Sequence, residues 1–177
     1  RTEPWPRRLP DRPLVLVGLS TSQQHQTPLL QRLCDALADL DIEGLVTTGP
    51  AIAPESLRAS DNTTVTSFVP HGHVLPSADL LITHAGNGTV MAGVTHGVPM
   101  LCFPMGRDQP LIAGRVADLG LGSVASPDAS VADIREAIAA LLRDAGVKQR
   151  SKDLARSLAD HPGLDHGVGL VEGLLHA

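Results

Sequence analysis

The chain has 177 residues, of which 42% are hydrophobic, 19% charged and 2% aromatic, and its formal net charge is −5. This length corresponds to about one domain with a proper core, and the composition is ordinary for a globular protein. Nucleic-acid binders are usually basic, so an acidic chain disfavours that class. Because tyrosine is absent, stacking platforms for single strands are not expected either.

The cysteines and the hydropathy pattern favour a reducing compartment. Cys34 and Cys102 lie in apolar periodic segments without a metal-type partner, which predicts buried free thiols. The sequence shows no signal-peptide pattern and no apolar run near the ~18 residues of a membrane-spanning helix. We therefore expect no transmembrane span and a cytoplasmic location.

Residues 1–12, RTEPWPRRLPDR, are rich in proline and arginine and lack periodicity. This composition predicts an interdomain linker, with the folded domain over residues 13–177. A chain that begins with a linker is expected to be the latter part of a longer protein.

Short apolar runs alternate with helical patterns through the first half of the chain. Thr27 is expected to cap a helix and Pro28 to take its first position, ahead of leucines at helical spacing. Residues 69–73, VPHGH, predict a turn, and a brief helical piece is expected from Val74. Strands are expected over residues 14–19, 44–48 and 64–68.

Residues 80–109 read LLITHAGNGTVMAGVTHGVPMLCFPMGRDQ and predict a strand, a glycine-rich turn, a helix and a second strand. Ser130 and Asp133 resemble a capping box, with Asp in place of Glu. The strands of this unit are expected over residues 80–83 and 100–103, a last strand near residues 123–124, and helices over 110–119, 131–143, about 147–160 and about 164–176.

Strands that alternate with helices predict an α/β fold with a mainly parallel sheet covered on both faces. We expect a Rossmann-like, doubly wound, six-stranded sheet of order 3-2-1-4-5-6. Ligands of such sheets bind outside the carboxyl ends of the strands where the order reverses, here the first and fourth. The first strand leads to Ser20 and Thr21, whose hydroxyls are candidate donors, and the fourth ends at His84, so both loops are expected at one crevice.

The turn after His84 has the chemistry of an anion site. The first amides of a helix lack intrahelical partners and lie at the positive end of its dipole. Gly86 and Gly88 carry no side chain that would keep an anion away. A phosphate is therefore expected on the amides of Asn87, Gly88 and Thr89, with the Thr89 hydroxyl and His84 as further donors.

A simpler alternative to an anion site is a tight turn capped by Asn87 or Thr89 beside a structural histidine.

Two well-known phosphate-binding motifs do not fit this turn. No lysine adjoins Gly88 and Thr89, as a P-loop requires, and Met91 stands where a dinucleotide fingerprint needs its third glycine.

The sequence His-Ala-Gly-Asn-Gly-Thr at residues 84–89, followed by Gly-Val-Pro at 97–99, Pro104 and Asp-Gln at 108–109, resembles the donor-binding signature of family-one glycosyltransferases of the GT-B fold. These are the UDP-glucuronosyltransferase-like enzymes and their bacterial relatives that glycosylate natural products. The resemblance implies the C-terminal half of a GT-B fold. It also implies an inverting transfer, without a metal cofactor, from a nucleotide diphosphate sugar to a hydroxyl of a small acceptor.

The same resemblance assigns roles to residues. His84 would contact the donor diphosphate, the loop of Val69, Pro70 and His71 would receive the nucleobase, and Asp108 and Gln109 would bind sugar hydroxyls. The general base is expected to be a histidine of an N-terminal, acceptor-binding domain, so no catalytic residue is expected in this chain.

Structural roles without ligand binding remain alternatives for two of these residues. His71 can instead be a surface turn residue, and Asp108 can cap the following helix. His71 and His73 also suggest a metal pair, but no carboxylate or cysteine completes a ligand set.

Two residues depart from the family pattern. Ala85 replaces the second residue of the usual His-Gly-Gly, which we take as a mild change. Ala92 stands where many members have a glutamate that binds ribose hydroxyls, so we expect dTDP-sugars to be favoured over UDP-sugars. Alternative functions are a stand-alone nucleotide-binding accessory module, or part of a GT-B sugar-nucleotide epimerase with carboxylates from an N-terminal domain.

Overall fold

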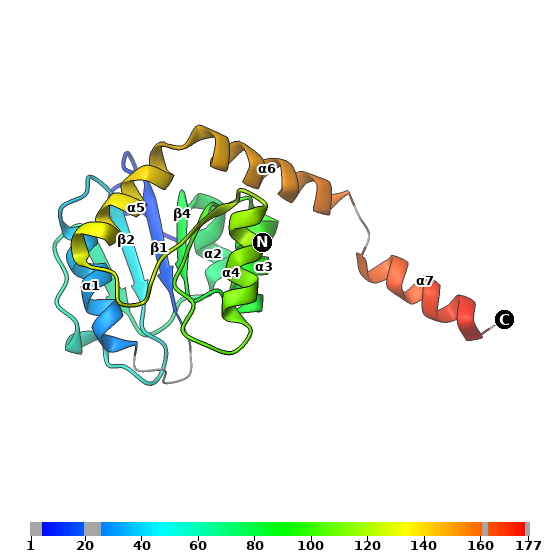
Figure 1. The fold of residues 1–177 in the computed structure, drawn as a ribbon, viewed down its shortest axis with the longest axis horizontal. Helices are drawn as coiled ribbons and strands as arrows, with labels where there is room; N and C mark the ends of the chain where they lie inside the picture. The colour runs from blue at the N-terminus through cyan, green and yellow to red at the C-terminus, as the bar shows by residue number, and fades with distance from the viewer. Residues whose placement is uncertain (1–4, 20–25, 161–162, 176–177) are drawn as a thin grey trace.

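The computed structural model describes residues 5–19, 26–160 and 163–175. Its strands are β1 (Leu14–Gly18), β2 (Glu43–Thr47), β3 (Thr63–Thr66), β4 (Leu80–Thr83), β5 (Met100–Cys102) and β6 (Gly122–Val124). All pair in parallel, in the order β3-β2-β1-β4-β5-β6. This order confirms the predicted doubly wound sheet, with its reversal between the adjacent strands β1 and β4 (Figure 1).

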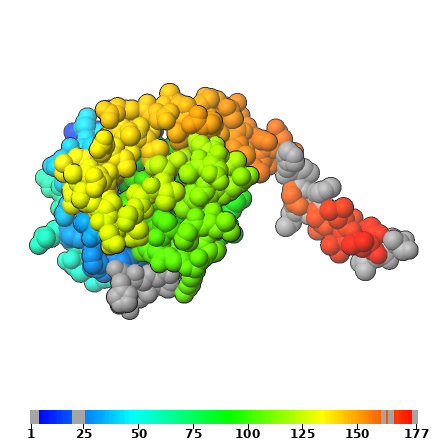
Figure 2. Space-filling view, viewed as in Figure 1, coloured from blue at the N-terminus to red at the C-terminus, as the bar shows by residue number. Residues whose placement is uncertain are grey.

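Helices cover both faces of the sheet. One face carries α1 (Thr27–Ala38) and α5 (Val131–Arg143), and the other carries α2 (His71–Val74), α3 (Asn87–His96) and α4 (Gln109–Asp118). Two 3₁₀ turns, η1 (Pro54–Ser56) and η2 (Leu75–Ser77), complete the connections. Then α6 (Ala145–Ala159) packs against α3, while α7 (Gly163–Leu175) stands clear of the body (Figures 1 and 2).

The central strand β1 shows how the two layers are built. Successive side chains of a strand point to opposite faces. Val15 and Val17 therefore join the core under α1 and α5, whereas Leu14 and Leu16 join the core under α3 and α4. All four side chains are fully buried, as expected of a parallel sheet covered on both faces.

The capping box at α5 is confirmed. Ser130 is the N-cap residue, its hydroxyl accepts from the Asp133 amide at 3.2 Å, and the Asp133 carboxylate accepts from the Ser130 amide at 3.3 Å. The predicted cap of α1 is wrong, because Thr27 is the first helical residue and Gln26 is the N-cap residue, whose side chain makes no capping hydrogen bond. Pro28 supports the start of the helix without such a cap, since its ring presets the helical φ.

Several boundaries differ from the sequence prediction by one or more residues. The strand β2 begins one residue earlier, at Glu43, and β3 ends at Thr66, so residues 67–70 leave the sheet. The VPHGH stretch is no simple turn, because its residues from His71 onward form α2.

Within the described residues, no helix is both long and apolar enough to cross a membrane.

Candidate functional site

The start of α3 lies at the carboxyl edge of the sheet, where the strand order reverses. Gly18 of β1 pairs with Thr83 of β4, and His84 follows directly. The first amide that bonds within α3 is that of Val90, which donates to the Gly86 carbonyl at 3.0 Å. The three preceding amides, those of residues 87–89, therefore have no acceptor within the helix.

This geometry has the form that an anion site needs, and it contradicts the alternative of a turn capped by Asn87 or Thr89. Gly86 is the N-cap residue, and Asn87 and Thr89 lie inside the helix, so neither caps it. Asn87 and Gly88 are exposed. The free amides and the positive end of the helix dipole thus face a surface that an anion can reach.

His84 packs directly against this turn. A Cβ on Gly86 would lie 2.5 Å from the His84 Nε2, so only glycine fits beside the ring. Burial lowers the pKa of His84, while the Asp108 carboxylate and the backbone of Gly18 act in the opposite direction. Within the part of the chain that the structure describes, His84 Nδ1 is buried without a hydrogen-bond partner.

Among the described residues, one non-glycine residue with positive φ lies in the loop after β4 and another in the loop after β5. Ala85 has φ +64° and Arg107 has φ +56°. A left-handed conformation costs an alanine roughly 1–2 kcal/mol, a cost that glycine escapes. The replacement of glycine by Ala85 is therefore less mild than its size suggests, because the backbone here has the conformation that favours glycine.

A cleft of about 240 Å³ joins the predicted base loop to α3. Val69, Pro70 and His71 line it together with Thr89, so the structure brings the predicted base residues and one predicted diphosphate residue to one cleft. Sequence reasoning missed its other lining residues, which follow β1, β2 and β3: Leu19, Thr47, Gly49, Ser67 and Phe68. Their shared signal was available, since all lie at or just beyond strand ends on the ligand edge.

His71 forms part of the wall of this cleft. A Cβ on Gly18 would lie 2.5 Å from its Cε1, so the ring rests on the end of β1. The Thr47 hydroxyl donates to the Val17 carbonyl at 3.0 Å, which leaves its oxygen to accept from His71 Nε2 at 3.4 Å. Burial lowers the pKa of His71. The alternative of a surface turn residue is wrong, because the side chain is half-buried on a helix.

Asp108 and Gln109 differ in their surroundings. Asp108 is exposed and is the N-cap residue of α4, but its side chain makes no capping hydrogen bond, so the alternative role as a side-chain cap is wrong. Gln109 is 4% exposed, and its Oε1 accepts from the Met105 amide at 2.7 Å. Gln109 thus supports the loop between β5 and α4, and sugar binding by either residue stays a prediction.

Three further predictions concern Ser20, Thr21 and the cysteines. Ser20 and Thr21 lie outside the described residues. Cys34 and Cys102 are free and buried, as predicted. Burial raises the pKa of Cys34, beside Asp35, to about 11 and that of Cys102 to about 12, so both thiols stay protonated. Among the described residues, no three His, Cys, Asp or Glu side chains form a group that could hold a metal ion.

A comparison with known protein families shows to which family the chain belongs. Residues 31–171 match the family described as the C-terminal domain of erythromycin biosynthesis protein CIII-like proteins. The chain belongs to this family. Its relatives are named glycosyltransferases, and the chain is the C-terminal domain of such enzymes.

Two curated relatives illustrate the match. The chain is 30% identical to the NDP-glycosyltransferase YjiC of Bacillus subtilis, over 93% of this chain and 43% of the relative. It is 30% identical to the demethyllactenocin mycarosyltransferase of Streptomyces fradiae, over 97% of this chain and 38% of the relative. The chain therefore spans less than half the length of these relatives.

Solved structures agree on the fold. CalG4, the calicheamicin glycosyltransferase, matches with a TM-score of 0.90 and 29% identity, over 98% of this chain and 46% of that one. The glycosyltransferase VinC in complex with dTDP matches with a TM-score of 0.78 and 26% identity, over 95% and 43% of the two chains. The chain is thus the C-terminal half of a GT-B glycosyltransferase fold.

Proposed function

We propose that this domain binds the donor of an inverting glycosyltransferase, a nucleotide diphosphate sugar, at the carboxyl edge of its sheet. One observation carries the proposal. The amide-bearing first turn of α3 and the loop of residues 69–71 share a single cleft through Thr89. Their chemistry fits a diphosphate on the amides and a base at the loop.

Within this proposal, the chain stabilises the leaving nucleotide rather than the attacking hydroxyl. Negative charge grows on the diphosphate as the bond to the sugar breaks, and the amides of residues 87–89 and His84 would stabilise such a charge. Asp108 and Gln109 would bind the sugar, and Ser20 and Thr21 would add hydroxyls to the diphosphate. No metal is required for this role.

Acceptor binding and general-base catalysis would belong to an N-terminal domain. The acceptor would be a hydroxyl of a small natural product, held by an N-terminal domain that also supplies a histidine as general base. We expect reaction in the cytoplasm. Ala92, where a ribose-binding glutamate is common in the family, supports a preference for dTDP over UDP donors.

Calorimetric titration with dTDP and with UDP tests the proposal. We expect binding in the micromolar to millimolar range, weakened at least tenfold in Thr89→Val and His84→Ala, with dTDP bound more tightly than UDP. A preference for UDP would contradict the interpretation of Ala92. Absence of binding by either nucleotide would contradict the proposed site.

A further inference from the structure

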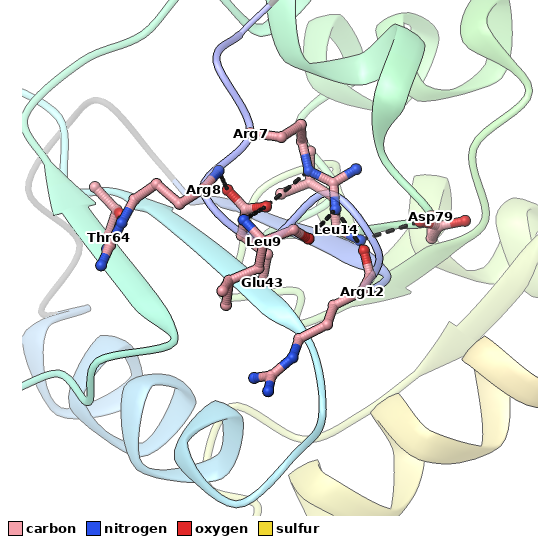
Figure 3. A network of polar contacts seen from close by, with 8 residues as sticks. All are labelled: Arg7, Arg8, Leu9, Arg12, Leu14, Glu43, Thr64 and Asp79. Carbon is pink, nitrogen blue, oxygen red and sulfur yellow. Dashed lines mark hydrogen bonds and ion pairs between the residues drawn. The ribbon is translucent and has the colours of Figure 1, made fainter.

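A buried carboxylate holds the amino-terminal segment to the sheet. Glu43 opens β2 and is only 3% exposed, and a buried charge is costly unless it is paired and hydrogen-bonded. Three donors from one short segment satisfy it: Arg7 Nε at 2.7 Å, the Arg8 amide at 2.9 Å and the Leu9 amide at 3.0 Å (Figure 3). This segment and the carboxylate therefore depend on each other.

We call residues 5–13 the strap. Besides Glu43, the strap contacts β3 through Arg8, whose Nη1 donates to Thr64 Oγ1 at 3.0 Å. An exposed ion pair joins Arg12 to Asp41 at 2.9 Å. The strap thus lies across the amino-terminal side of the sheet, where β1 and β2 begin (Figure 3).

The strap also reaches α2. The Trp5 amide donates to the His73 carbonyl at 3.0 Å, and the Trp5 side chain packs against the core cluster that includes Val69 and Val74. A helix of four residues has almost no stability of its own. The position of α2 is therefore set by its tertiary contacts, which include Val74 in the core, the strap at His73 and the end of β1 at His71.

We propose that the strap is a positioning element for the nucleotide cleft and that Glu43 is the residue that fixes it. While Glu43 holds residues 7–9, Trp5 stays on α2, and α2 keeps the loop of residues 69–71 in place at the cleft. Release of the strap lets α2 shift and lowers the affinity for nucleotide. Because coupling is reciprocal, bound nucleotide also holds the strap closed. This inference rests on the proposed nucleotide site.

Trypsin digestion combined with calorimetry tests the coupling. Trypsin cuts after Arg7 and Arg8, whereas Arg12 precedes a proline and resists. In Glu43→Gln, which keeps the shape and removes the charge, we expect cleavage at these two bonds at least tenfold faster than in the parent chain and about fivefold weaker dTDP binding. Saturating dTDP should slow cleavage of the parent. The matched control, Asp41→Asn, removes only the exposed pair with Arg12 and should change neither quantity.

Circular dichroism would detect misfolding of Glu43→Gln. A second variant, Trp5→Ala, keeps the coupling testable in that case. Trp5→Ala weakens the contact with α2 but leaves the buried carboxylate paired, and it should lower the affinity for dTDP to a similar degree. Equal cleavage rates in the parent and Glu43→Gln would overturn the role of Glu43. Faster cleavage with unchanged dTDP affinity in both variants would overturn the coupling. If the parent binds no nucleotide, the proposed function and the coupling both fail, while the cleavage rates still decide whether Glu43 fixes the strap.

Discussion

Phe68 exposes 73% of its surface beside the cleft that it lines with Val69 and Pro70. A large apolar ring is stabilised by burial, so an exposed ring at a cleft is well placed to receive a flat ligand. Stacking of a base on an aromatic side chain contributes about 1–3 kcal/mol. Phe68 therefore offers the proposed nucleobase a stacking surface beside the backbone groups of residue 69.

We predict that Phe68→Ala weakens nucleotide binding by about 1–3 kcal/mol without lowering the stability of the fold. Titration of the variant with dTDP measures the first quantity and denaturant unfolding the second. Leu111→Ala is a matched control, because Leu111 is 79% exposed on α4 and does not line the cleft. Equal affinities in the Phe68 variant and the parent would show that no base stacks there.

Glu43 gives a pH dependence of stability. Burial works to raise its pKa, but the Arg7 side chain and the amides of Arg8 and Leu9 outweigh burial and hold the pKa below its usual value. A lowered pKa in the folded state means that the stabilisation is fully present above the pKa of the unfolded chain, about 4.3. It is then lost as the pH falls through the lower pKa of the folded state.

We therefore predict that the parent loses more stability than Glu43→Gln when the pH is lowered from about 5 to about 3. At pH 7 the substitution should cost about 2 kcal/mol, the range for hydrogen bonds to a charged group. Denaturant unfolding at a series of pH values measures both effects. Parallel profiles for the two proteins would contradict the account of Glu43.

Among the elements, α3 is the one on which the site depends. The two glycines at its start, Gly86 at the N-cap and Gly88 in the first turn, differ in their surroundings. A Cβ on Gly86 would collide with the His84 ring, whereas a Cβ on Gly88 would meet no atom of the described residues within 4 Å beyond its chain neighbours and the backbone of its own helix. Gly88 is therefore not required by packing. We infer that glycine at this position serves ligand binding, since a backbone without a side chain lets an anion reach the amides.

This contrast predicts that Gly88→Ala folds at least as stably as the parent but binds dTDP more weakly, by about tenfold. Alanine is favoured over glycine within a helix by about 0.5–1 kcal/mol. Gly114→Ala on α4 is the matched control, because a Cβ there also meets no atom within 4 Å. It should gain the same stability and keep full affinity. Thermal unfolding and calorimetry of both variants would show whether the two effects separate.

The elements also show what the sequence could and could not predict. Hydrophobic runs located the strands, and the cap signal located the capping box at Ser130, because these depend on neighbours along the chain. The start of β2 at Glu43 was missed, because its partners lie about 35 residues away. Likewise α2 was predicted as a turn, since the contacts of His71 with Gly18 and Thr47 are tertiary.

The candidate site was predictable to a similar degree. The glycine-rich turn, His84 and the loop of residues 69–71 were identified from strand ends and from the family signature. Phe68 was assigned to a strand and so escaped notice. The buried position of Gln109 could not be foreseen either, because its partner, the Met105 amide, is brought near by the loop after β5.

At the scale of the whole molecule, the chain is one half of a two-domain fold. It spans 43% of the B. subtilis relative and 46% of CalG4, and α7 stands clear of the body with Val168, Leu170 and Leu174 exposed (Figure 2). The carboxyl edge of the sheet carries the candidate donor site, and the acceptor side is expected from the other half. The isolated domain should therefore bind without reacting.

We predict that the isolated chain binds dTDP but releases no nucleotide diphosphate from a dTDP-sugar in the presence of hydroxyl acceptors. The reason is that the expected general base and acceptor site belong to the N-terminal domain. Coupled detection of released dTDP measures the reaction, and joining the chain to the N-terminal half of a relative should restore turnover. Robust sugar transfer by the chain alone would contradict the assignment of the acceptor site and the general base to the N-terminal domain.

The most direct test of the donor site is an amide NMR spectrum of the chain titrated with dTDP. The account predicts that the amide signals of Asn87, Gly88 and Thr89 shift most, together with that of Val69, while signals of α5 on the other face stay in place. The same titration with thymidine should move Val69 but leave the α3 amides nearly unchanged. If dTDP binds and those three amides do not respond, the diphosphate lies elsewhere and the proposed site is wrong.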